Sequence, residues 1–326
     1  MRRRSFTAAT LAAALSRRAL AQVEPEPWPG RRPVRIVYPF AAGGVGDAYA
    51  RMLAEHCAQA LGGTFLVENR TGASGAIGTA FVANQPADGH SFIMNSNSSQ
   101  VVAPLVLRDP GFDPMRSLSP VTRLYRYGMY LLINPRIPAR TVGEFVAWAK
   151  AQRRGVNMAS VGVGSVGHLT AEMFSRRAGF AVEHIPYRGG PTTLLALAQG
   201  EADYVFDSVG NAQPTVKEGM IRGLAVTGLR RSPAVPEIPT ILESGFQGFE
   251  DDVWFALYAP AGTPRAIIDA MNAETRRFLN SPTFQARLAA NAHEGVGSTP
   301  EEVMADIVAE TPSWEEVIRT LRIEKQ

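Results

Sequence analysis

The sequence predicts an α/β fold in which a parallel sheet is covered by helices on both faces. Three observations lead to this class: short apolar runs alternate with helical patterns, glycine-rich turns follow several runs, and polar residues gather where the runs end. Short apolar runs are typical of buried strands, and strand–helix alternation is typical of parallel sheets. At 326 residues, the chain is long enough for one large domain or two compact lobes.

The first predicted strand and helix enclose a glycine-rich loop. Residues 34–40 form an apolar run and residues 48–61 a helical pattern, with Asp47 at the expected N-cap. This order aims backbone N–H groups at an anion. Gly43, Gly44 and Gly46 do not fit a dinucleotide fingerprint, and the loop lacks the lysine of a Walker loop. A plain tight turn and a cradle for a small anion both remain open.

Two further strands complete a βαβαβ unit. Residues 64–68 and 91–95 predict strands, and a second glycine-rich turn at 69–78 opens a helix at 77–84. A polar cluster at 95–99 follows the third strand. Because ligands bind beyond the carboxyl ends of parallel strands, these turns predict a ligand site.

The middle of the chain predicts a second unit of the same kind. Its expected strands are residues 130–134, 157–160, 182–186, 202–207 and 224–227. Its expected helices begin at Thr141, where Glu144 completes a capping box, and span residues 169–178 and 192–199. A third glycine-rich turn, at 161–168, follows Ser160.

The last part of the chain predicts one strand and three helices. The strand covers residues 254–259, and Pro264 starts a helix at 265–279. Helices at 282–291 and 300–321 follow, the second after a start signal at Thr299.

The N-terminus predicts an export signal peptide at residues 1–21. Arginines at positions 2–4 precede a modestly apolar run, and residues 19–21 form an A-x-A-like cleavage site. Residues 3–6 are similar to a twin-arginine signal. Ser16, Arg17 and Arg18 interrupt the apolar region, so a degenerate leader is the alternative. Removing this segment, which holds five arginines and no acid, changes the formal net charge from +3 to −2 and leaves no reason to expect a nucleic-acid partner.

Composition excludes several classes of protein. No run of 18 or more apolar residues follows the leader, so no membrane span is predicted. Cys57 is the single cysteine of the sequence, which excludes a disulfide within the chain. The five histidines lack metal-ligand spacing, so neither a metal nor a cofactor is expected.

The third turn carries a catalytic alternative. Ser165 and His168 are a candidate nucleophile and base of a cleft hydrolase. Anion binding uses this turn more directly, because its glycines and serines present donors at a helix N-terminus. The glycine-rich turns hold no lysine, which argues against a highly charged phosphate ligand. Asp47 and Asp207 are expected to contact water or a ligand amine, with capping and turn closure as the alternatives.

Ordered blocks across residues 32–321 resemble a known family. The blocks include VRIVYPFAAGG with Asp47, VENRTGASGAIG, GVGS with His168, IPY, FD, LAVTG and APAGTP. This pattern resembles the extracytoplasmic solute receptors of the tripartite tricarboxylate transporter, also called the Bug family. The resemblance implies a periplasmic binding protein rather than an enzyme, which captures a small carboxylate for uptake or for sensing. It implies membrane transporter subunits or a membrane sensor as partners, and a monomer.

The resemblance also implies a two-lobed fold of the type II flytrap class, each lobe a sheet flanked by helices. Lobe 1 would hold residues 32–123 and 252–326, and lobe 2 residues 124–251. Two crossing segments, near residues 121–126 and 252–257, would form the hinge.

The implied ligand-binding residues come from both lobes. They are Tyr38, Phe40, Ala41, Gly43, Gly44, Asp47, Gly72, Ala73, Ser74, Gly75, Asn95 and Ser96 in lobe 1, and Ser160, Gly162, Gly164, Ser165, His168, Tyr187, Gly189 and Asp207 in lobe 2. The family loop often has two prolines where this chain has Ala41 and Ala42, and Val166 and Gly167 remove a hydroxyl donor from the third turn. The first departure predicts a less rigid loop, and the second favours a less polar carboxylate.

Overall fold

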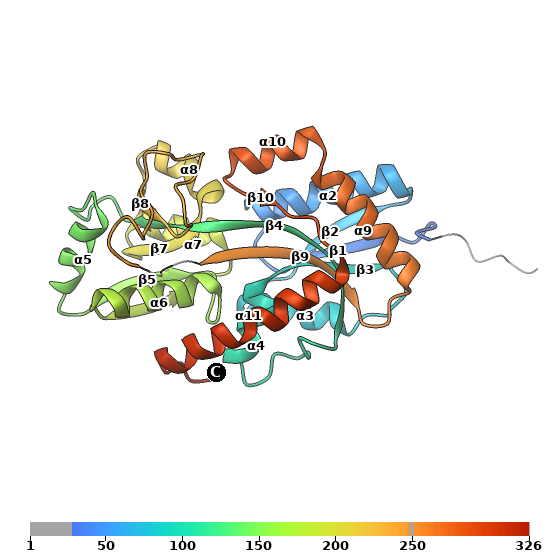
Figure 1. The fold of residues 1–326 in the computed structure, drawn as a ribbon, viewed down its shortest axis with the longest axis horizontal. Coiled ribbons are helices and arrows are strands. Elements are labelled where there is room, and N and C mark those ends of the chain that lie inside the picture. Colours follow the sequence, from blue (N-terminus) through green and yellow to red (C-terminus); the bar gives the residue numbers. More distant parts are fainter. Residues whose placement is uncertain (1–27, 248, 250, 326) are drawn as a thin grey trace, which may run out of the picture.

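The computed structural model describes residues 28–247, 249 and 251–325. The predicted export signal at residues 1–21 lies outside this part of the chain. Figure 1 shows two α/β units side by side, joined by two long strands that cross between them. The strands that the structure describes form one curled sheet in the order β2-β1-β3-β9-β4-β7-β5-β6, with β8 and β10 also pairing with β4.

The first unit is built from the N-terminal and C-terminal parts of the chain. Its strands are β1 (Val34–Tyr38), β2 (Phe65–Asn69), β3 (Ser91–Ser96), most of β9 (Asp252–Pro260), the first part of β4 (Leu118–Ile133) and β10 (Glu294–Gly295). Its helical segments are α2 (Val45–Leu61), η1 (Ala73–Gly75), α3 (Ala76–Ala83), η2 (Ser98–Val102), α4 (Ala103–Val106), α9 (Arg265–Leu279), α10 (Pro282–Ala290) and α11 (Pro300–Leu321).

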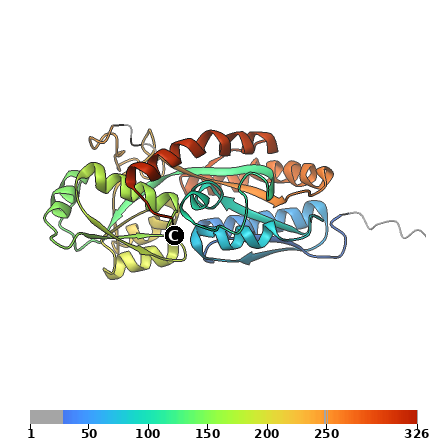
Figure 2. The same cartoon turned by 90° about the horizontal axis from the view of Figure 1, so that it is seen from below.

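The second unit is built from the middle of the chain. Its strands are the end of β4, β5 (Val156–Ser160), β6 (Val182–Pro186), β7 (Tyr204–Ser208) and β8 (Arg222–Val226). Its helices are α5 (Val142–Lys150), α6 (Val166–Ala178), α7 (Gly190–Gln199) and α8 (Val209–Lys217). Helix α11 of the first unit lies along both units and reaches α6, where Arg176 donates a hydrogen bond to the Thr320 carbonyl (Figure 2).

The sheet is mixed, whereas the sequence pattern predicted a parallel sheet. Strands β1, β2 and β3 pair in parallel, as do β5, β6 and β7. The crossing strands β4 and β9 pair antiparallel with each other and with their neighbours β7 and β3. The prediction was wrong at the centre because both crossing strands run between the units instead of returning through a helix.

Strand β4 changes partners at the boundary between the units. Its residues as far as Gly128 pair with β9, and from Met129 onward they pair with β7 and β8. The predicted strand at 130–134 captured only the end of this strand. Its first part alternates apolar residues with polar ones such as Arg123, whose guanidinium lies 4.7 Å from the Trp254 ring. That alternation hid the strand from a search for continuous apolar runs.

Local signals fixed the helix starts more closely than the strand ends. Thr141 and Thr299 both form capping boxes, with Glu144 and Glu302, at the predicted starts of α5 and α11. Asp47 was predicted to be the N-cap of α2, and this prediction was wrong. The N-cap is Gly44, and Asp47 lies in the first turn of the helix. The Asp47 carboxylate accepts hydrogen bonds from Gly43 N at 3.1 Å and from the Asn69 amide at 2.9 Å, which hold the loop against β2.

Candidate functional site

The two units meet around a cavity that both of them line. Hydrogen bonds that cross between them here include Val45 N to Asn211 Oδ1 at 3.0 Å, Val166 N to Ser98 Oγ at 3.0 Å, and Ser74 Oγ to the Val163 carbonyl at 2.5 Å. Each joins the first unit to the second, so the structure has a closed interlobe cleft. The centre of a water molecule can occupy about 60 Å³ of the cavity.

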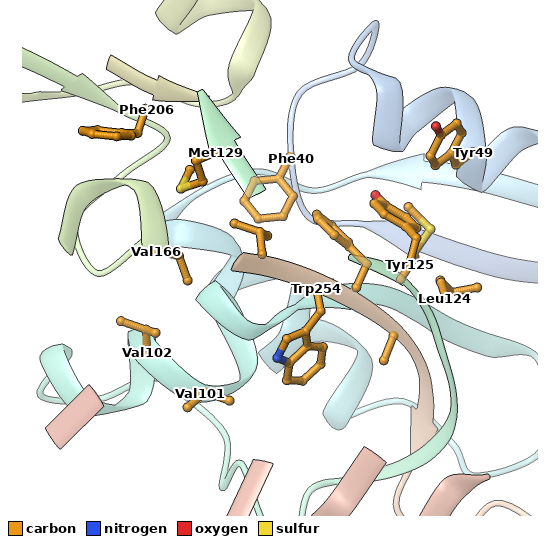
Figure 3. Packing of buried hydrophobic residues seen from close by; sticks show 14 of the residues in the cluster. Phe40, Tyr49, Val101, Val102, Leu124, Tyr125, Met129, Val166, Phe206 and Trp254 are labelled. Carbon is orange, nitrogen blue, oxygen red and sulfur yellow. The ribbon is translucent and has the colours of Figure 1, made fainter. Parts of the chain in front are cut away.

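Aromatic and aliphatic side chains form most of the cavity wall. Phe40 and Phe255 from the first unit have ring centroids 6.0 Å apart, and Tyr38 lies 5.6 Å from Phe40. Met129 and Phe206 come from the second unit and also line the cavity, and the Phe206 ring points away from Phe40 (Figure 3). The full lining is Tyr38, Phe40, Ala41, Gly44, Ser96, Ser98, Tyr127, Met129, Val161, Gly167, Gly190, Pro191, Phe206, Asp207, Asn211, Val253 and Phe255.

The cavity holds few polar groups, and several of these have no hydrogen-bond partner within the described part of the protein. Ser96 Oγ is buried and has no hydrogen-bond partner in the described structure. Gly167 and Gly190 lie in the first turns of α6 and α7, where backbone N–H groups have no partner within the helix. No lysine or arginine of the described residues lines the cavity. An anion bound here would therefore meet hydroxyl and amide donors rather than a cation.

Asp207 is the charged residue of the wall. One carboxylate oxygen accepts hydrogen bonds from Ser208 N at 2.6 Å and the Asn211 amide at 2.9 Å, and the other accepts one from Thr193 Oγ1 at 3.2 Å. These contacts tie the end of β7 to α7 and α8. Burial raises the pKa of Asp207, against the opposing effect of the three hydrogen bonds.

Six of the predicted ligand residues line the cavity: Tyr38, Phe40, Ala41, Gly44, Ser96 and Asp207. The others lie around it. Gly72, Ala73, Gly75, Gly162 and Tyr187 border a neighbouring space between the units, and Gly43 borders a third. Asp47, Ser74, Asn95, Ser160, Gly164, Ser165, His168 and Gly189 line none of these spaces. Asp47 forms an ion pair with Arg51 at 3.1 Å, and the Ser160 hydroxyl lies 2.6 Å from His184 Nε2.

Sequence reasoning missed the residues that the crossing strands contribute. Tyr127 and Met129 alternate along β4, and Val253 and Phe255 alternate along β9. This period of two marks one face of a strand. This alternation was present in the sequence. However, apolar residues at every second position are also typical of strands that pack in a buried core.

The arrangement of Ser165 and His168 gives the serine a structural role. Ser165 Oγ donates to the Gly162 carbonyl at 2.8 Å and accepts from His168 N at 3.2 Å, which makes it the N-cap of α6. The His168 ring accepts a hydrogen bond from Gly164 N and stacks on His184 at 4.0 Å. Burial, and then the neighbouring His184, lower the pKa of His168 to about 3. Among the described hydrogen bonds, none joins the imidazole to the Ser165 hydroxyl that it would have to activate.

Gly46 allows the cavity wall to pack against α2. A Cβ atom at this position would lie 2.2 Å from the hydroxyl oxygen of Tyr38, which lines the cavity. We expect Gly46→Ala to push the Tyr38 ring and to destabilise the protein by about 1–3 kcal/mol. The control is Gly143→Ala in α5, where a Cβ has no neighbour within 4 Å and the change should stabilise by about 0.5–1 kcal/mol. Urea unfolding of both variants checks this; equal stabilities would contradict it.

Within the described residues, no helix has the length and apolar character needed to cross a bilayer. The same residues contain no cluster of three or more histidine, cysteine or acidic side chains placed to hold a metal ion.

Comparison with known proteins gives consistent matches over most of the chain. Residues 49–323 match the sequence profile TctC, described as the tripartite tricarboxylate transporter family receptor. A UPF0065 protein of Pseudomonas sp. from the tcbD–tcbE intergenic region is 32% identical over 90% of this chain and 87% of its own length. Protein BugT of Bordetella pertussis is 31% identical over 92% of each chain.

Solved structures match the fold as well. The periplasmic binding protein BugD has a TM-score of 0.86 and 33% identity, over 90% of this chain and 99% of its own. Rpa4515 of R. palustris, solved with adipate, has a TM-score of 0.87 and 33% identity over 91% and 99%. MatC of Rhodopseudomonas palustris, solved with malate, has a TM-score of 0.84 and 29% identity over 88% and 99%.

Proposed function

Because the chain belongs to the tripartite tricarboxylate transporter receptor family, we propose that it is a periplasmic solute-binding protein. Its structural neighbours are solute-binding proteins and not enzymes. It captures a small carboxylate with a substantial apolar part in the interlobe cavity. The capture takes place in the periplasm. The liganded form delivers its cargo to a membrane transporter of the tripartite tricarboxylate type.

The cavity itself carries this proposal. Residues of both units line it, and hydrogen bonds join the units beside it, as a protein that closes around a solute requires. The neighbours Rpa4515 and MatC were solved with adipate and malate, both small carboxylates. In this chain the donors for such a group are the unpartnered Ser96 hydroxyl and the helix N-terminal amides near Gly167 and Gly190. Ordered waters can complete these contacts at little cost in affinity.

The wall composition favours an apolar body on the ligand. Phe40, Phe206, Phe255 and Met129 surround the same space, and no basic side chain of the described chain offers a second strong anchor there. A ligand with a negative charge at each end and no apolar stretch would therefore leave both ends without a cation. Burying an apolar stretch against these rings contributes about 25 cal/mol per Å².

The two units serve as the two lobes in this proposal, with lobe 1 from residues 32–123 and 252–326 and lobe 2 from residues 124–251. The change of β4 pairing between Gly128 and Met129 supports a hinge slightly beyond the predicted segment at 121–126. Strand β9 pairs antiparallel with β4 along the crossing. This pairing supports β9 as a second hinge strand that moves together with β4.

A thermal-shift screen tests the proposed function. Protein freed of carried-over ligand by unfolding and refolding is heated with dicarboxylates, aliphatic and aromatic monocarboxylates, amino acids and uncharged analogues. Stabilisation by a carboxylate with an apolar body, at concentrations above its Kd, is the expected result. No stabilisation by any carboxylate would overturn the proposal. Growth of a deletion strain on the identified acid then separates uptake from sensing.

Ser96 gives a prediction specific to the binding role. We expect Ser96→Ala to weaken carboxylate binding by about tenfold, the value of one good hydrogen bond to a charged group. The unliganded protein should keep or raise its melting temperature, because the change removes a buried hydroxyl that has no partner. Calorimetric titration and thermal melting measure the two effects. Ser91→Ala, at the other end of β3 and outside the cavity, is the control. Unchanged affinity in Ser96→Ala would remove this residue from the site.

A further inference from the structure

A second space between the two units lies beside the ligand cavity. We call it the outer chamber; it is bordered by Gly72 and Ala73 of the first unit and by Gly162, Tyr187 and Arg188 of the second. The centre of a water molecule can occupy about 350 Å³ of the outer chamber, compared with about 60 Å³ of the cavity. Ala73 and Arg188 are exposed, so the outer chamber reaches the surface of the protein.

Two segments of the chain pass directly from the outer chamber to the ligand cavity. In the first unit, Pro39 borders the outer chamber, Ala41 lines the cavity, and Phe40 between them borders both spaces. In the second unit, Arg188 borders the outer chamber and Gly190 lines the cavity. Two residues of extended chain span at most about 7 Å. The two spaces therefore lie within the reach of one short aliphatic chain.

Apolar side chains form the boundary between the two spaces. Phe40 comes from the first unit and Val161 from the second, and each borders the outer chamber as well as the cavity. A methylene chain that runs between these side chains leaves water for apolar contacts, which favours binding. The boundary therefore suits the apolar body that the proposed ligand carries.

Arg188 differs from every other residue of the described chain that borders either space, because it is a cation. No acidic side chain of the described residues borders the outer chamber with it. Within the same part of the chain, its guanidinium has neither an ion pair nor a hydrogen bond. A guanidinium presents a planar set of N–H donors that matches the two oxygens of a carboxylate. Arg188 is thus available to an anion that enters the outer chamber.

Other donors at this end are already occupied. The Tyr187 hydroxyl donates a hydrogen bond to the Glu201 carboxylate at 3.1 Å, and Gly162 N donates one to Ser160 Oγ at 3.1 Å. An anion in the outer chamber would have to break these contacts to use either group. Arg188 offers its donors without such a cost.

We propose that the cavity and the outer chamber form one elongated site, in which Arg188 binds a second carboxylate at the far end of the ligand. The inference rests on the proposed function, in which the first carboxylate is held near Ser96, Gly167 and Gly190. It narrows the ligand class to an acid with an apolar chain between two anionic ends. A very short diacid gains nothing from Arg188, because its second end stays inside the cavity.

Pairs of acids with equal chain length separate the effect of the second charge from the effect of length. The pairs are butyrate with succinate, hexanoate with adipate, and octanoate with suberate, titrated calorimetrically into protein freed of carried-over ligand. In the parent, we expect adipate or suberate to bind about three- to tenfold more tightly than its monocarboxylate partner, as for an ion pair that is partly exposed. Succinate should have no advantage over butyrate. Arg188→Gln should remove the advantage of the long diacids.

Two further variants separate charge from structure. Arg188→Lys keeps the positive charge and should keep part of the advantage, although a lysine lacks the planar donor set. Arg154→Gln is the matched control, because Arg154 is also an exposed arginine of the second unit but precedes β5, whose other end leads into the third turn at the cleft. This control should retain the full advantage. All three variants should melt at the parental temperature, because both arginines are exposed.

The titrations distinguish failure of this inference from failure of the proposed function. If the parent binds carboxylates but prefers no long diacid, or if Arg188→Gln keeps the parental preference, the elongated site is wrong and the proposed function stands. If the parent binds none of the acids, the proposed function falls and the elongated site falls with it.

Discussion

Replacing Gly189 with leucine should abolish ligand capture while leaving the unliganded protein folded. Gly189 lies in the second unit, just before α7, and a Cβ atom there would be 2.9 Å from the Cβ and 3.0 Å from the N of Ala41 in the first unit. Its φ of 165° is extended backbone that any residue adopts, so the substitution causes no local strain. The clash exists only when the two units are closed.

The expected loss of affinity is on the order of a hundredfold or more. Contacts this short force the units apart, and each 1.4 kcal/mol added to the cost of closure weakens binding about tenfold. Calorimetric titration with a carboxylate from the screen measures the loss, and thermal melting without ligand should give the parental value. Adding Ala41→Gly to the variant removes one side of the clash and should restore part of the affinity. Parental affinity in Gly189→Leu would show that the closed arrangement is not the form that holds ligand.

The same contact explains what the glycine-rich turns do. They were predicted as cradles for an anion, yet several of them lie where the two units touch. A Cβ at Gly162 would be 2.7 Å from Ser74 Oγ, and a Cβ at Gly164 would be 2.2 Å from Val106 of the first unit. Missing side chains at these positions let the units approach each other. The sequence pattern could not distinguish glycines that face a ligand from glycines that face the other unit.

The elements that the sequence predicted best are those specified by neighbouring residues. The bounds of α9 and α11 agree with the prediction because Pro264 and the Thr299 capping box mark their starts. Helix α8 was missed because Pro214 stands inside it and Gly210 near its start, both of which are typical of loops. Its N-cap, Ser208, accepts a hydrogen bond from Asn211 N at 3.2 Å, a signal that was present in the sequence.

The walls of the cavity could not be predicted locally. Phe206 and Phe255 are almost fully buried, as core residues are, and only the meeting of β4, β7 and β9 places them around one space. That meeting depends on pairings between residues more than 100 positions apart, such as Tyr125 with Phe255. Patterns within a window of some 20 residues do not contain this information.

Replacing Asp207 with asparagine should strengthen binding of simple carboxylates and remove the pH dependence of that binding. Asp207 lines the cavity, and the groups that face it are the Thr193 hydroxyl, the Asn211 amide and the phenols of Tyr38 and Tyr127. No cation of the described chain shares this wall, so an ionised Asp207 repels an ionised ligand. Two unit charges about 5 Å apart repel by roughly 3 kcal/mol at an effective dielectric constant of about 20.

The sign of the pH effect follows from burial, which raises the pKa of Asp207. A raised pKa means that the folded protein holds this proton more tightly than the unfolded chain does. Stability is therefore lost as pH rises from the ordinary carboxyl range through the raised pKa, and carboxylate affinity should fall over the same window. As pH decreases through that window, Asp207 becomes neutral and binding should tighten, until the ligand itself is protonated.

Affinities measured from about pH 5 to about pH 8 for the parent and for Asp207→Asn check both statements. The variant should bind at least about tenfold more tightly at the upper end and show a flat profile. Asp203→Asn is the matched control, because Asp203 precedes the same strand and burial also raises its pKa, but it lies outside the cavity. Weaker binding by Asp207→Asn would contradict the repulsion argument. A ligand that binds less tightly once the Asp207 charge is removed must present an ammonium group or another donor to that carboxylate. Asp207 thus decides between a simple carboxylate and an amine-bearing one, a choice that the aromatic rings of the wall leave open.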